Sequence, residues 1–135
     1  MITYRADKSV DLETFIDVYR RSTLGERRPI QNRQIMAAML EHADVLITAW
    51  EGQLLVGLAR TLTDFEYVAY LADLAVDEAY QRRGIGRELI LHTQAALKPS
   101  CFITLLAAPK ANDYYPRVGF HHNPRAWLLP ARTGA

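Results

Sequence analysis

The sequence predicts one α/β domain of the α+β type over residues 1–135, with a mixed, mostly antiparallel sheet of six or seven strands flanked by about four helices. The first observation is length, because 135 residues, half of them hydrophobic, suit one domain with a sizeable core and are too few for two. The second is that short apolar runs alternate with segments of helical period. The third is an apolar strand that passes through a glycine-containing basic turn directly into an amphipathic helix.

The first third of the chain predicts one strand, two helices and a loop. Ile2 to Arg5 form the strand, and four apolar residues at helical spacing then predict a helix. These four residues are Leu12, Phe15, Ile16 and Tyr19. The polar stretch Ser22 to Arg33 predicts a loop at the rim of a substrate site, and the apolar residues between positions 35 and 40 predict a second, short helix.

The middle of the chain predicts a hairpin followed by a central strand. Val45 to Trp50 and Gln53 to Thr61 flank Glu51-Gly52, where glycine permits the positive φ of a tight turn. Tyr67 to Val76 is a nearly unbroken apolar run, which is typical of a strand covered on both faces.

The last third predicts helices and strands in alternation. A helix from Gly84 to Leu97 is ended by Pro99, since proline lacks the N–H that a helix interior needs. A buried strand is expected from Cys101 to Leu106. Further elements are a short helix at Ala111 to Val118 and a final strand pair at Phe120 to His122 and Ala126 to Leu129.

Charge and composition restrict the classes of partner. The formal net charge of +1 gives no general case for binding nucleic acid or membrane, and no window holds the roughly 20 apolar residues of a membrane span. A lone cysteine, Cys101, cannot form an internal disulfide and favours a reducing compartment. We therefore expect a cytoplasmic protein without a targeting segment, whose partner is a small molecule.

The segment from Leu74 to Leu89 has the properties of a phosphate-binding loop. Gly84 and Gly86 allow backbone N–H groups to converge on an anion, and the start of the following helix adds about half a positive charge. A kinase-type P-loop is excluded because Arg87, not lysine, follows the last glycine. The dinucleotide fingerprint is excluded because Leu89 occupies the place of its third glycine.

The remaining pattern, Gln81-x-x-Gly84-x-Gly86 after a strand, resembles the coenzyme A pyrophosphate loop of the GNAT superfamily of acyl-CoA-dependent N-acetyltransferases. The segment Tyr114 to Phe120 is similar to the aromatic-Tyr-x-x-x-Gly-Phe signature of the same superfamily. The resemblance spans nearly the whole chain and is weakest in the first third. It implies acetyl-CoA as co-substrate and one N-acetyltransferase domain over residues 1–135.

The resemblance also implies a set of coenzyme-binding residues. Leu74, Ala75 and Val76 would lie along the pantetheine arm, and a backbone N–H there would stabilise the oxyanion. Backbone amides would hold the pyrophosphate, with two further side chains bordering it. The amides belong to Arg83, Gly84, Gly86 and Arg87, and the bordering residues are Gln81 and Arg82.

Tyr115 matches the superfamily tyrosine that protonates the departing thiolate, and Tyr114 is the better candidate for packing in the core. The general base is open, because some family members carry a glutamate early in the central strand where this chain has Tyr70. Asp73 is expected either to serve as base, directly or through water, or to be held by structural hydrogen bonds, and Glu66 is a further candidate for the base.

No metal is predicted, since His121 and His122 are adjacent on a strand and point to opposite faces, and the other histidines have no ligand at metal-binding spacing. The expected function is direct acetyl transfer to a primary amine of a small molecule or peptide. A CoA-binding sensor without catalysis is the first alternative, and a nucleic-acid module ranks last. A homodimer is left open.

Overall fold

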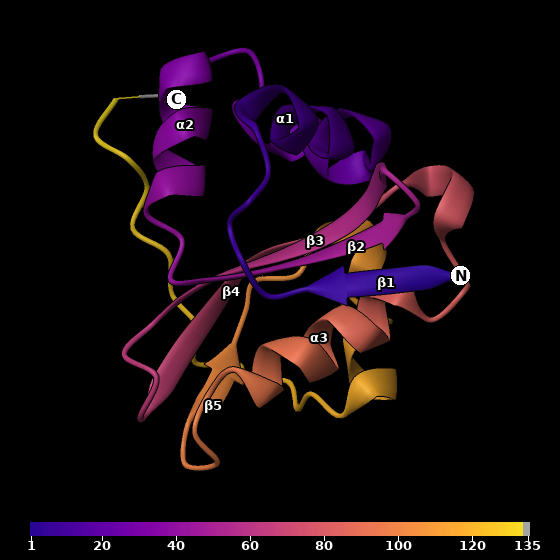
Figure 1. Cartoon of the computed structure of the whole chain (residues 1–135). Coiled ribbons are helices and arrows are strands. Elements are labelled where there is room, and N and C mark those ends of the chain that lie inside the picture. The colour runs from indigo at the N-terminus through magenta and orange to yellow at the C-terminus, as the bar shows by residue number, and fades with distance from the viewer. Residues whose placement is uncertain (134–135) are drawn as a thin grey trace.

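The computed structural model describes residues 1–133 and consists of one mixed sheet with helices on both faces (Figure 1). The sheet has five strands in the order β1-β2-β3-β4-β5. The strands are β1 (Ile2–Arg5), β2 (Val45–Glu51), β3 (Leu54–Thr63), β4 (Val68–Val76) and β5 (Phe102–Thr104). The α-helices are α1 (Leu12–Arg21), α2 (Arg33–Glu41) and α3 (Ile85–Ala95). Short 3₁₀ helices are η1 (Thr23–Arg27), η2 (Glu78–Tyr80), η3 (Pro109–Ala111) and η4 (Tyr115–Val118).

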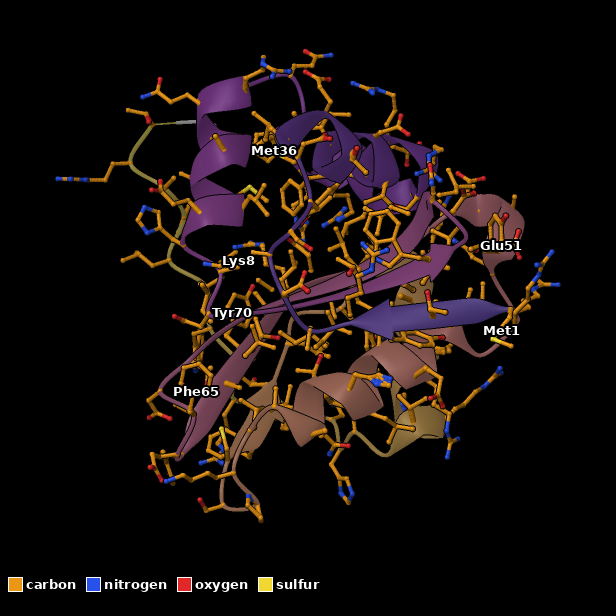
Figure 2. All side chains as sticks on the ribbon, viewed as in Figure 1. Met1, Lys8, Met36, Glu51, Phe65 and Tyr70 are labelled. Atoms are coloured by element: carbon orange, nitrogen blue, oxygen red, sulfur yellow. The ribbon has the colours of Figure 1, made fainter. Side chains whose placement is uncertain are left out.

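The two faces of the sheet carry separate apolar cores. Helices α1 and α2 cover one face, and α3 covers the other (Figure 1). On the first face Phe15 and Met36 are fully buried, and Figure 2 shows Met36 in the layer between α2 and α1. On the second face, Leu89 of α3 is fully buried against the sheet. The apolar residues whose spacing predicted α1 lie on the face of the helix that packs in the core.

The residues at the N-cap positions explain where the helices begin. The Asp11 carboxylate accepts a hydrogen bond from the Thr14 amide at the start of α1, and Asn32 caps α2 through the Ile35 amide in the same way. Helix α3 differs, because its N-cap is Gly84 in the left-handed region with no side-chain cap. Its first amides are therefore left for another acceptor.

The sheet opens beside β4, because β4 pairs with β5 over only part of its length. Strands β1 to β4 are antiparallel neighbours, whereas β4 and β5 are parallel and pair only from Val68↔Phe102 to Tyr70↔Thr104. Beyond Tyr70, the edge of β4 that faces β5 is unpaired. On its other edge the register with β3 shifts, so that Ala72 is an extra residue between Leu71 and Asp73. This bulge bends β4 where it leaves β5.

The prediction of six or seven strands and four helices was wrong in number. The sheet has five strands. The segment Ala111 to Val118 contains no α-helix, since η3 ends at Ala111 and only the 3₁₀ helix η4 follows, with Pro116 inside it. No strand forms at Phe120 to His122 or Ala126 to Leu129. The apolar side chains of Trp127, Leu128 and Leu129 are 74–94% exposed, so this run gains no burial from pairing.

The strand predicted at Cys101 to Leu106 shortens to Phe102–Thr104, and it is less buried than expected because Phe102 is 50% exposed at the edge of the sheet. Within residues 1–133, no helix is both long and apolar enough to cross a membrane.

Candidate active site

A cleft of about 970 Å³ opens where β4 separates from β5. One wall is the second half of β4, and the opposite wall is the segment that follows β5. The start of α3 closes one end of the cleft, and the turn η1 with its flanking residues borders the other. Tyr70, labelled on β4 in Figure 2, also lines the cleft. The polar stretch predicted as a substrate rim supplies five of its lining residues, Ser22, Thr23, Leu24, Arg27 and Arg28.

The loop between β4 and α3 presents backbone amides to the cleft. Arg82 and Gly84 both have positive φ, 66° and 81°, so two of three consecutive residues are in the left-handed region. Among the backbone hydrogen bonds of residues 1–133, none is donated by the amides from Arg82 to Arg87. These amides lie at the positive end of the α3 dipole. The arrangement therefore suits a phosphate group.

Different structural reasons favour glycine at the two glycine positions of this loop. A Cβ at Gly84 would meet no atom within 4 Å, so glycine is favoured there by its φ of +81° and not by lack of space. A Cβ at Gly86 would lie 2.8 Å from the hydroxyl oxygen of Tyr114. Gly86 thus allows Tyr114 to approach the helix start, a contact that links the two sequence motifs.

The side chains around the loop divide between the cleft and the fold. Those of Gln81 and Arg82 line the cleft, and Gln81 also donates a hydrogen bond to the Val76 carbonyl at 3.2 Å. The guanidinium of Arg83 instead stacks on Tyr80, with its carbon 4.8 Å from the ring centre. Arg83 and Arg87 do not line the cleft, so their predicted role in binding the pyrophosphate stays a prediction.

The second half of β4 supplies an extended wall. Leu74, Ala75 and Val76 all line the cleft, as the resemblance implied, and their edge toward β5 is unpaired. An extended ligand can lie along such an edge and pair with its amides and carbonyls. The seven lining residues of the predicted coenzyme set are Leu74, Ala75, Val76, Gln81, Arg82, Gly84 and Gly86. Their binding roles stay predictions.

Tyr114 and Tyr115 both line the cleft, and both also pack against the apolar core beside α3, as was expected for Tyr114. Their rings meet edge to face at 5.4 Å, and Tyr115 meets Phe120 in the same way. Burial raises the pKa of Tyr115 to about 12, with a further rise from Tyr114 and a small opposing effect of Arg28. Tyr115 is therefore a protonated donor throughout the physiological range.

That pKa changes the balance of the expected proton transfer. A free thiol has a pKa of about 8.5. Full proton transfer from Tyr115 to the thiolate therefore crosses a pKa difference of roughly 3.5 and is uphill by about 5 kcal/mol. An unperturbed phenol, with a pKa of about 10, would be closer to the thiol. The structure favours a hydrogen bond from Tyr115 to a developing thiolate over complete transfer before the C–S bond breaks.

Asp73 lies in the most polar buried cluster of the site. Its side chain is 0% exposed and accepts hydrogen bonds from Tyr19 Oη at 2.5 Å, Arg28 Nε at 2.5 Å and Arg60 Nε at 2.6 Å. Arg28 also donates to the Ala72 carbonyl, at the bulge of β4. The carboxylate is thus surrounded by three donors, which is the environment of an anchor more than of a base.

The cluster shifts the ionisation of its members. Burial first, and then the charge of Asp73, raise the pKa of Tyr19 well above its usual value. Burial works to lower the pKa of Arg60, but Asp73 outweighs it and the pKa is raised. Arg28, Arg60 and Tyr19 were missed by sequence reasoning. A signal existed for Arg60, which is a lone charge within the apolar β3 strand.

A metal centre has no support among residues 1–133, where no three His, Cys, Asp or Glu side chains are grouped to hold an ion. This finding leaves the prediction about metal as a prediction.

Fold and site together define a class of protein: an α+β domain whose central strand parts from its parallel neighbour beside an anion-binding loop. The family model for the acetyltransferase (GNAT) domain matches residues 17–125. The chain belongs to this family, and the resemblance drawn from its two motifs is confirmed.

Two curated plant proteins are similar over part of their length. The probable acetyltransferase TAP2 of Glycine max is 28% identical over 126 residues, which are 81% of this chain and 50% of that protein. GCN5-related N-acetyltransferase 2, chloroplastic, of Arabidopsis thaliana is 33% identical over 72 residues, covering 52% of this chain and 28% of that protein. The chain therefore spans half or less of the length of these relatives.

Solved structures match over nearly the full chain. A GNAT-family acetyltransferase from Streptococcus pneumoniae is 26% identical with a TM-score of 0.79, covering 98% of this chain and 100% of that one. An aminoglycoside N-acetyltransferase, AAC(6')-Iy, solved with CoA, has a TM-score of 0.75 at 17% identity, covering 98% and 96%. At 17% identity the likeness concerns the fold alone.

Proposed function

We propose that the chain is an acetyl-CoA-dependent N-acetyltransferase, which moves the acetyl group directly to a primary amine in a ternary complex. One observation carries the proposal: the unpaired edge of β4 leads straight to the free amides at the start of α3. A molecule with an extended arm and a diphosphate matches both parts of this surface. Members of the GNAT family take their acetyl group from acetyl-CoA, and CoA is bound in the AAC(6')-Iy structure.

The transfer requires one bond to form and one to break. The neutral amine nitrogen attacks the thioester carbonyl carbon, and the C–S bond then breaks to give the amide and the thiolate. A backbone N–H in the Leu74 to Val76 segment would hold the oxyanion of the tetrahedral intermediate. Tyr115, protonated at neutral pH, would donate a hydrogen bond to the leaving sulfur.

The attacking amine must also lose a proton. We propose that Asp73 positions Arg28 and Arg60 and is not the direct base, because both of its oxygens already accept hydrogen bonds. The positive charge of the two guanidiniums favours the neutral form of a nearby amine. The proton would then leave through water in the open cleft, which needs no dedicated carboxylate.

Thiol release from acetyl-CoA, measured against a panel of primary amines, tests the proposal. An N-acetyltransferase releases thiol only when a suitable amine is present, and its initial rates give intersecting lines when both substrates are varied. Parallel lines would indicate a covalent acetyl-enzyme instead of direct transfer.

The second candidate is a CoA-binding sensor without catalysis, and the observation that favours it is the lack of an unpaired carboxylate in the cleft lining among the described residues. Tight acetyl-CoA binding with no thiol release for any amine would support the sensor. We also propose that residues 1–135 act as a single acetyltransferase domain on a small-molecule or peptide acceptor. Cytoplasmic location and a homodimer stay predictions.

A further inference from the structure

The charge of the cleft is unevenly distributed. The whole chain is nearly balanced, with 16 lysines and arginines against 15 aspartates and glutamates. The cleft lining is not balanced, since it contains six basic side chains and only one acidic side chain, Asp73. The basic residues are Arg27, Arg28, Arg60, Arg82, Lys110 and Arg117. A net positive cleft attracts anions and repels cations.

One diphosphate-binding loop does not account for this excess. Of the six residues, Arg82 lies in the loop before α3, whereas Arg27 and Arg28 come from the opposite border at η1 and Arg60 comes from β3. This second border lies beside Tyr70 and Leu62, away from the helix start. It is the part of the cleft where the acceptor would enter under the proposed function.

The two inner arginines are held in place and only half neutralised. Asp73 supplies one negative charge for Arg28 and Arg60 together. The three guanidinium nitrogens of Arg28 donate hydrogen bonds to Asp73, the Arg27 carbonyl and the Ala72 carbonyl. The side chain of Arg60 is only 12% exposed. Within the described chain, the hydrogen bond of its guanidinium is the one that Nε donates to Asp73. The Tyr19 hydroxyl also lies close to this guanidinium, but among the described residues no carboxylate or carbonyl accepts a hydrogen bond from its two terminal nitrogens, which can therefore bind an anion at the cleft.

We infer that the acceptor of this enzyme is an amine that also carries a carboxylate, and that Arg60, assisted by Arg27, binds this carboxylate. The inference rests on the proposed acetyltransferase function and names the substrate class of the same site. A planar guanidinium with two free N–H edges matches the two oxygens of a carboxylate. A polycationic acceptor would place its charges against Arg27, Arg28 and Arg60 with only Asp73 to compensate.

Matched pairs of acceptors that differ only in the acidic group test the inference. Thiol release is measured with L-phenylalanine against phenethylamine, with 4-aminobutyrate against propylamine, and with spermidine as a polycation. The 2-aminoethylphosphonate and ethylamine pair separates carboxylate from phosphate-like recognition. We expect kcat/KM to be at least roughly tenfold higher for the carboxylate in one pair or more, and spermidine to be the poorest acceptor.

Variants then assign the selectivity to the arginines. Arg60→Gln should reduce the carboxylate preference about tenfold with an unchanged Kd for acetyl-CoA, and Arg60→Lys should restore part of it. Arg27→Gln, an exposed position where folding is not at risk, should reduce it by a smaller factor. Arg33→Gln is the matched control, since that arginine pairs with Glu13 at the surface.

The outcomes separate the inference from the function on which it rests. Equal rates within every pair, a preference for the amine without the acid, or a preference unchanged in Arg27→Gln would overturn the inference and leave the acetyltransferase function standing. A preference for the phosphonate alone would overturn the carboxylate assignment. No thiol release with any amine would overturn both.

Discussion

Replacing Asp73 by asparagine should destabilise the fold more than any other single polar change at the site. The substitution removes one buried negative charge that accepts from Tyr19, Arg28 and Arg60. It leaves two guanidiniums facing each other across an amide that donates on one side. Breaking a buried ion pair by removing one partner costs about 3–5 kcal/mol. We expect a loss of this size from the free energy of unfolding.

The size of the effect can be read in a thermal melt. With an unfolding entropy of about 2.1 cal/mol/K per residue, this loss corresponds to a fall in Tm of roughly 10–18 °C for a chain of this length. Circular dichroism of Asp73→Asn beside wild type measures it. Glu66→Gln is the control, because that carboxylate pairs with Lys98 at 62% exposure and should cost no more than about 1 kcal/mol.

The same variant distinguishes an anchor from a base. If Asp73 were a catalytic base with little structural role, Asp73→Asn would keep its Tm within about 2 °C and lose turnover alone. That result would refute the assignment of Asp73 as the residue that positions Arg28 and Arg60. A large fall in Tm at an unchanged Tm for the control would support it.

Three further predictions concern the coenzyme and the leaving group. Gly84→Val should weaken acetyl-CoA binding at least tenfold in calorimetry, whereas Gly52→Val, with a similar positive φ at a residue that does not line the cleft, should lower stability alone; equal affinities in the two variants would contradict the loop assignment. Tyr115→Phe should lower kcat roughly 10- to 100-fold and leave the Kd for acetyl-CoA within about twofold, and an unchanged kcat would remove Tyr115 from the chemistry. Because burial raises the pKa of Tyr115 to about 12, kcat/KM should rise with pH as the amine loses its proton and stay high up to about pH 10; a fall between pH 7 and 9 in wild type that Tyr115→Phe abolishes would contradict this.

The parts of the fold that could be predicted are those written in contiguous residues. The hairpin at Glu51-Gly52 follows from a turn that needs positive φ, and Gly52 has a φ of +59°. The strand, loop and helix from Val68 to Ala95 follow from an apolar run, two glycines and a helical period within one segment. In each case the information that decides the structure is local.

The buried cluster could not be predicted because its members are distant in sequence. Asp73 is 54 residues from Tyr19, 45 from Arg28 and 13 from Arg60. Sequence alone left open whether Asp73 is a base or is satisfied by structural bonds. The packing of α1 and η1 on β4 brings Tyr19 and Arg28 to it, and the pairing of β3 with β4 brings Arg60. The roles of the predicted site residues still await an experiment.

The prediction of strands in the C-terminal segment was wrong for a different reason. Alternating and apolar residues at Phe120 to His122 and Ala126 to Leu129 predicted strands, but Pro124 and Pro130 interrupt the run and supply no amide for a ladder. A pattern of apolar residues specifies a strand only when a partner edge buries it. In residues 119–133 the structure has no such pairing.

A crystal structure of the protein with acetyl-CoA tests most directly whether the free amides at the start of α3 bind a diphosphate. The account predicts phosphate oxygens about 2.7–3.2 Å from amide nitrogens between Arg82 and Arg87, with the pantetheine arm along Leu74 to Val76. A diphosphate held elsewhere, or an α3 start whose amides turn to protein acceptors in the complex, would contradict it.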